Sequence, residues 1–254
     1  MATIEEARKL ASSLRSDRLI EIRVGTTGDS RPFLVPQSTL ERTSPYFTAA
    51  LRREGFTEGR EGVLRFPEDD LSAWEILLAW MTTGEVPELP EVRHSDEDST
   101  EVDERREAAQ LLAISCWPLG DAYNIPKFQD ELVLQLMAHF QIYGVTKNVL
   151  SRTLHLSPVG SKLTKLVLED AVMGCMSNDD VEAAIDGKNA LSEFLRARER
   201  HRANDSVFDH RLDLGGHDFA GPYARWTDYV SESPHCHWVY TYVDPDCLST
   251  QPCD

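Results

Sequence analysis

The sequence predicts an α+β fold in which a small three-stranded sheet flanked by helices is followed by a helical C-terminal extension. Residues 18–24, RLIEIRV, alternate polar and apolar side chains as a half-buried strand does. A turn-rich segment and a second apolar run, PFLV, follow it and predict a hairpin. VLRF at 63–66 has the composition of a third strand, and the later apolar residues recur at helical spacing.

Composition excludes several classes of protein. The chain has 254 residues and a net charge of -17, so it is large enough for one or two domains and should repel nucleic acid and anionic membranes. Its five cysteines are scattered and odd in number, which favours a reducing compartment over a disulfide framework. The opening MATIEEARKL lacks the apolar centre of a signal peptide. We therefore expect an intracellular protein, in the cytoplasm and/or the nucleus, without a membrane anchor.

Residues 1–16 predict an N-terminal helix. Thr3 and Glu6 have the spacing of a capping box, and apolar residues recur on one face. The members of that face are Ile4, Ala7, Leu10, Ala11 and Leu14. This face is expected to pack either on its own domain or on a second subunit in a homodimer.

The next helices carry clear start and stop signals. Ser38 opens a short helical piece, and Ser44 followed by Pro45 predicts an N-cap and first-turn proline. The segment after VLRF supplies an acidic cap, an apolar helix and a glycine stop at Gly84. The buried stripe expected for that helix consists of Leu71, Trp74, Leu77, Leu78 and Met81.

Residues 85–107 hold ten acidic and three basic side chains, which predicts a solvated insertion that the fold accommodates as a loop. A helical pair follows, and Pro126 is expected to begin a helix with the stripe Phe128, Leu132, Leu136 and Phe140. The extension at 144–203 should add helices near 146–156, 160–176 and 178–202, the last with a break at Gly187. Residues 204–254 have the composition of a poorly ordered tail.

Three blocks in this order resemble the BTB/POZ domain, in particular its fungal forms, over residues 17–143. The first block carries Phe33, Val35, Leu40, Ser44, Tyr46 and Phe47 at the places of the family's opening strand and "S-x-Y-F" signature. The second carries Asp69, Asp70, Trp74, Leu77, Leu78 and Gly84. The third carries Asp121, Tyr123, Ile125 and Pro126. The chain departs from the family pattern at Pro36 and Gln37, which replace His and Lys, and at Met81 and Thr82, which replace Leu and Tyr.

The resemblance implies a non-catalytic protein–protein interaction module without a cofactor. Such a module self-associates, or acts as an adaptor that links another protein to a cullin-type ubiquitin ligase. Cullin-binding members have an apolar residue, any residue and then glutamate before the third strand of this core, and Phe56, Thr57 and Glu58 match that pattern. Phe56 either anchors the partner beside the Glu58 carboxylate or packs back on the helix of Tyr46 and Phe47.

The residues themselves give no sign of an enzyme, because no phosphate-binding glycine loop, nucleophile elbow or helical zinc motif is present. One alternative is a zinc-binding protein or metal-dependent enzyme centred on the tail. The weak candidate ligands are His235, Cys236, His237 and Cys247, whose residue types zinc accepts. Their spacing matches no compact zinc knuckle, which favours the interpretation that they are scattered polar residues of the tail. Stoichiometric zinc that is lost when His235, Cys236 and His237 are replaced would favour the metal alternative.

Overall fold

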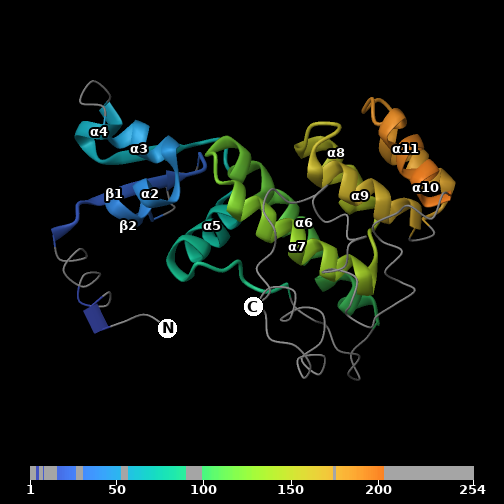
Figure 1. The fold of residues 1–254 in the computed structure, drawn as a ribbon, viewed down its shortest axis with the longest axis horizontal. Coiled ribbons are helices and arrows are strands. Elements are labelled where there is room, and N and C mark those ends of the chain that lie inside the picture. The colour runs from blue at the N-terminus through green and yellow to red at the C-terminus, as the bar shows by residue number, and fades with distance from the viewer. Residues whose placement is uncertain are drawn as a thin grey trace, which may run out of the picture. The chain divides into compact units, whose positions relative to one another are not determined.

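The computed structural model describes residues 4, 5, 8, 16–26, 31–52, 57–89, 99–173 and 176–202. These residues form a mixed α+β fold that is mostly helical and contains a small three-stranded sheet (Figure 1), as predicted. The chain divides into two compact units. The first combines Met1–Pro87 with Leu119–Ile125, and the second combines Glu88–Pro118 with Pro126–Asp254.

The sheet of the first unit has the strand order β2-β1-β3. Strand β1 (Leu19–Val24) pairs antiparallel with β2 (Phe33–Pro36), which confirms the hairpin, and parallel with β3 (Val63–Phe66). In this register Ile20 lies opposite Val35, and Ile22 lies opposite Leu64. All four of these side chains are buried, because alternate residues of a strand point to the same face.

Four helices accompany this sheet, and Figure 1 shows α2, α3 and α4 close to its strands. They are α2 (Gln37–Thr43), α3 (Pro45–Arg52), α4 (Thr57–Glu61) and α5 (Leu71–Thr83). The predicted cap of α3 is present, since Ser44 Oγ accepts a hydrogen bond from the Tyr46 backbone N at 3.0 Å. The start and stop of α5 are also confirmed: Asp70 accepts from Ala73 N at 3.1 Å, and Gly84 adopts a φ of 84°.

The stripe predicted for α5 is wrong at two positions. Trp74, Leu77 and Met81 are buried as predicted. Leu71 is 39% exposed and Leu78 is only partly buried, while Trp80 is buried instead. At 3.6 residues per turn Leu71 lies roughly 120° around the helix axis from Leu77. The buried arc of α5 therefore turns toward Trp80 and away from Leu71.

The core of the first unit is aromatic. Phe47 of α3, Phe66 of β3, Trp74 of α5 and Tyr123 pack around one another, with centroid separations of 4.7 Å for Phe66 and Trp74 and 5.5 Å for Phe47 and Tyr123. Ring packing of this kind adds to the stabilisation from burial alone. It joins the sheet, two helices and the segment that returns at residues 119–125.

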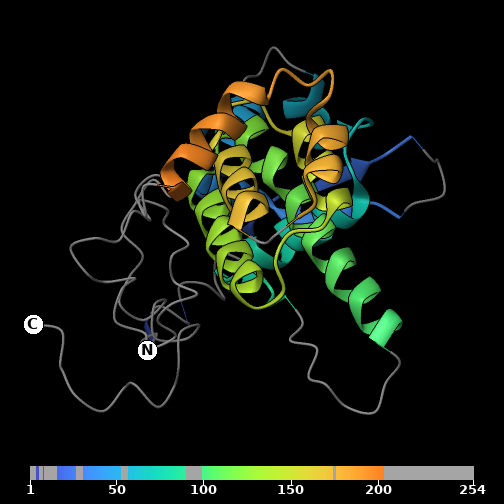
Figure 2. The ribbon, with the colours of Figure 1, turned by 90° about the vertical axis from the view of Figure 1, so that its right-hand side faces the viewer.

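The second unit is helical. Its helices are α6 (Ser99–Ala122), α7 (Pro126–Tyr143), α8 (Lys147–Leu156), α9 (Lys162–Met173), α10 (Asn178–Ile185) and α11 (Leu191–Arg202). The last residues of α6, from Leu119 on, belong to the first unit. These bounds confirm the predicted helices and the break at Gly187, which has a φ of 66°. The predicted stripe of α7 is buried. Helices α8 and α11 both pack against α9 (Figure 2).

The loop prediction for the acidic segment is wrong for residues 99–107, which form the first turns of α6. Charges of opposite sign alternate here at helical spacing: Arg105 pairs with Glu101 at 3.6 Å, and Arg106 pairs with Asp103 at 2.9 Å. The Arg106 guanidinium also lies 4.1 Å from the centroid of the Tyr143 ring on α7. These contacts hold a strongly charged sequence in a helix.

Candidate functional site

A groove of about 310 Å³ opens in the first unit among α3, α4 and β3. Its lining combines small and aromatic side chains with one carboxylate and one guanidinium. The lining residues are Tyr46, Ala49, Ala50, Glu58, Leu64, Arg65 and Phe66. Concave, largely apolar surfaces with a few polar groups are the usual places for a ligand or a partner side chain.

Helix α3 builds one wall of the groove. Tyr46, Ala49 and Ala50 are spaced at i, i+3 and i+4, so they share one face of the helix. The two alanines leave room beside the larger ring. Tyr46 is 41% exposed, yet its ring contacts those of Phe47 and Tyr123 at centroid separations of 5.4 and 5.1 Å. The core therefore fixes one side of this ring and leaves the other open to a partner.

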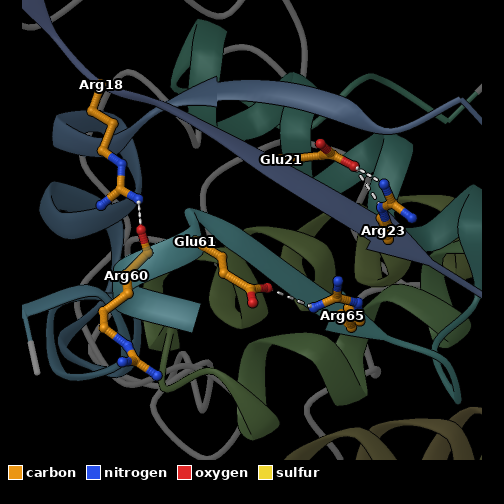
Figure 3. Close-up of polar contacts among 6 residues, drawn as sticks. All are labelled: Arg18, Glu21, Arg23, Arg60, Glu61 and Arg65. Carbon is orange, nitrogen blue, oxygen red and sulfur yellow. Dashed lines mark hydrogen bonds and ion pairs between the residues drawn. The ribbon is translucent and has the colours of Figure 1, made fainter. Parts of the chain in front are cut away.

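Strand β3 supplies another part of the lining. Leu64 and Phe66 are buried and supply apolar surface, while Arg65 between them is exposed. Arg65 pairs with Glu61 at 3.8 Å, and both side chains are about half exposed (Figure 3). Exposed pairs of this kind contribute little to stability, so Arg65 can exchange Glu61 for a carboxylate of a partner at small cost.

Burial and the nearby negative charges both favour the neutral form of Tyr46. Burial raises the pKa of the Tyr46 phenol above its ordinary value, and the negative charges of Asp69 and Glu58 raise the pKa further. The hydroxyl therefore keeps its proton at neutral pH. The groove offers a hydrogen-bond donor at Tyr46 and an acceptor at Glu58.

Side-chain hydrogen bonds of Ser44 and Asp69 hold the aromatic rings of the core behind Tyr46. Asp69 accepts from the Trp74 indole Nε1 at 2.7 Å and from the Tyr123 hydroxyl. Ser44 Oγ donates to the backbone carbonyl of Tyr123. Burial and the hydrogen bond to Asp69 both raise the pKa of Tyr123. This network fixes the rings against which Tyr46 packs.

The predicted partner-binding loop, Phe56 to Glu58, is described only in part, and Thr57–Glu61 forms helix α4 instead of a loop. Glu58 lies in α4 and lines the groove, whereas Phe56 lies outside the described residues. The sequence interpretation missed Tyr46, Ala49, Ala50 and Arg65 as lining residues. The one local signal for them was the pair of alanines one turn after Tyr46, since small residues beside an exposed aromatic ring leave a hollow.

The other predicted sites lie largely outside the described part of the chain. Of the N-terminal stripe, Ile4 is described and is 76% exposed, while Ala7, Ala11 and Leu14 are not described. The weak metal candidates His235, Cys236, His237 and Cys247 also lie outside it. Within the described ranges, no three His, Cys, Asp or Glu side chains gather as a metal site requires. Over the same ranges, no helix has the length and apolar character needed to cross a membrane.

Comparison with known proteins adds no family to these observations. Neither a family model nor a curated protein matches this chain.

Proposed function

We propose that this chain is a non-catalytic protein–protein interaction module of the BTB/POZ type whose groove binds a helical segment of a partner protein. In its most concrete form the partner is the N-terminal domain of a cullin-type ubiquitin ligase scaffold. The observation that carries this proposal is the groove itself, in which the half-exposed Tyr46 and the carboxylate of Glu58 stand beside two alanines.

The roles of the residues that carry the resemblance support the BTB/POZ assignment. Ser44 of the first block bonds the carbonyl of Tyr123 of the third, and Asp69 of the second block accepts from the Tyr123 hydroxyl. Residues from all three blocks thus meet in one compact unit. These contacts between the three blocks support the assignment, because local sequence pattern and packing then agree.

The lining also defines the chemistry of the partner. Ala49 and Ala50 leave space for an apolar side chain that would pack against the Tyr46 ring. Glu58 favours a lysine or arginine on the partner, and Arg65 favours a carboxylate. An amphipathic helix presents such side chains on one face, at spacings of three and four residues.

Filling the groove tests this proposal. Ala49→Trp adds bulk to an exposed alanine of the lining without removing a polar contact. Ala183→Trp, at an exposed helical alanine of α10, is the matched control. In a fluorescence titration with a cullin N-terminal domain, we expect Ala49→Trp to weaken binding by at least about tenfold, while Ala183→Trp changes it by less than about twofold.

Thermal unfolding and light scattering complete the experiment. Both variants should unfold close to the wild-type temperature, because both positions are exposed. If the two variants bind the cullin domain equally well, the groove is not the site that the partner binds. A wild-type chain that binds no cullin domain but forms a stable dimer would leave self-association as the function of the module.

A further inference from the structure

Arg18 reaches from the start of β1 to the end of helix α4. Its Nη1 donates to the Gly59 carbonyl at 2.7 Å, and its Nη2 donates to the Arg60 carbonyl at 2.7 Å. Figure 3 shows this side chain extending to Arg60. One guanidinium therefore binds two consecutive backbone carbonyls that lie more than forty residues later in the chain.

Helix α4 needs such support because it is only five residues long. A single turn of helix is unstable by itself, and its last carbonyl groups have no partners within the helix. These carbonyls also carry the negative end of the helix dipole. A cation that donates two hydrogen bonds to these carbonyls supplies their missing partners and also balances the helix dipole. The planar guanidinium of arginine suits this geometry better than a lysine ammonium.

Gly62 completes the attachment of α4 to the sheet. Its φ of 73° suits glycine, its N donates to the Glu58 carbonyl at 2.8 Å, and its own carbonyl accepts from Glu21 N at 2.8 Å. A Cβ atom at this position would stand 2.7 Å from Nη2 of Arg18. The guanidinium thus lies in the space that the absent side chain leaves free.

We propose that Arg18 is a positioning residue for partner recognition: it fixes the end of α4 and thereby holds Glu58 in the groove. Arg18 is not part of the groove lining, so it acts through α4 and not by contact with the partner. This inference rests on the proposed function of the groove.

The test removes the guanidinium and keeps most of the aliphatic stem. Arg18→Met is compared with Arg23→Met, which removes an exposed arginine of β1 that pairs with the nearby Glu21 side chain. We expect Arg18→Met to weaken binding to a cullin N-terminal domain by about tenfold, because two charge-assisted hydrogen bonds are lost. The control variant should bind within about twofold of wild type.

A double-mutant cycle with Glu58→Gln separates positioning from general damage. If Arg18 acts through Glu58, Arg18→Met should weaken binding by less than about twofold in the Glu58→Gln background. If the two changes instead raise the dissociation constant by factors that multiply in the double variant, Arg18 and Glu58 act independently. That result would overturn the proposal.

Hydrogen exchange at the Gly62 amide supplies a readout that needs no partner. This amide is bonded to the Glu58 carbonyl, so its exchange should accelerate in Arg18→Met and stay unchanged in Arg23→Met. Unchanged exchange in Arg18→Met would refute the proposal that Arg18 holds the end of α4. If the wild type binds no cullin domain, the proposed function fails, and the exchange experiment alone decides whether Arg18 holds α4.

Discussion

Tyr123 donates a hydrogen bond from its phenol hydroxyl to the carboxylate of Asp69, which stands 54 residues earlier in the chain. The same carboxylate accepts from the Trp74 indole at 2.7 Å. One acidic side chain thus satisfies two aromatic donors in the core that supports Tyr46. The shape of the groove depends on this arrangement, because Tyr46 packs on Tyr123.

Removing this carboxylate should destabilise the protein. Asp69→Ala leaves the Tyr123 hydroxyl and the Trp74 Nε1 without their acceptor, and we expect a loss of about 2 to 4 kcal/mol in the free energy of unfolding. The exposed neighbour Glu68 gives the control, since Glu68→Ala should change this free energy by less than about 0.5 kcal/mol. Urea denaturation measures both. Equal small effects would mean that the two hydrogen bonds do not stabilise the core.

His139 should make stability depend on pH. Its side chain is 5% exposed, its Nδ1 lies 3.0 Å from Gln110 Nε2, and burial together with the nearby Arg106 charge lowers the pKa of His139 to about 4. The unfolded chain, with an ordinary histidine pKa near about 6.5, binds the proton more readily between these values. The stabilisation is therefore complete above the unfolded pKa and is lost as the pH falls toward 4.

The variant His139→Gln isolates this contribution from that of the carboxylates. Between pH 7.5 and pH 4.5 the wild type should lose roughly 2 to 3 kcal/mol more unfolding free energy than the variant. Urea denaturation at the two pH values measures the difference. The same loss in both proteins would show that His139 does not stay neutral when the chain folds.

The second unit contains a buried ion pair whose disruption should be costly. Glu169 of α9 is almost fully buried and pairs with Arg200 of α11. Arg200→Met leaves this carboxylate without its cationic partner, and we expect a loss of about 3 kcal/mol in unfolding free energy. Arg202→Met breaks the exposed pair with Glu199 and should cost less than about 0.5 kcal/mol.

The double variant Arg200→Met with Glu169→Leu gives a second check in the same denaturation experiment. It replaces the pair by apolar side chains and should recover most of the stability lost in Arg200→Met. A double variant as unstable as the single one would assign the loss to packing of the Arg200 stem and not to the loss of its charge beside Glu169.

Local signals predicted most of the secondary structure. The alternation at Ile20 and Ile22 predicted a strand, and Asp70 and Gly84 predicted the two ends of α5. Each signal depends on neighbours within a few residues, so it can be read along the chain. The turns of α6 at 99–107 were missed because the excess of acidic residues indicates a loop, although Glu101 with Arg105 and Asp103 with Arg106 have helical spacing. The contact of Arg106 with Tyr143 adds support that only the folded chain brings near.

The candidate site depends more on contacts between distant segments. The Phe56 to Glu58 pattern predicted a partner-binding loop, and Glu58 lines the groove. The remaining lining was not predictable, because Tyr46 and Phe66 come together only through the register of β3 and the packing of α3. The attachment of Arg18 to the Gly59 and Arg60 carbonyls has no signature in the sequence, since backbone acceptors are the same at every residue type.

The double variant Phe56→Ala with Glu58→Ala tests the predicted loop directly. If this loop carries the recognition, binding to a cullin N-terminal domain should fall by at least about tenfold, since an apolar anchor and its neighbouring charge are both removed. Survival of binding in this variant would show that the interface assignment is wrong. The thermal unfolding temperature serves as the control for folding.

The most direct test of the central claim is a fluorescence titration of the wild-type chain with a cullin N-terminal domain, combined with light scattering at physiological salt. We predict saturable binding with an equal molar ratio of the two chains. A chain that neither binds the cullin domain nor forms a dimer would contradict its assignment as an interaction module of this type.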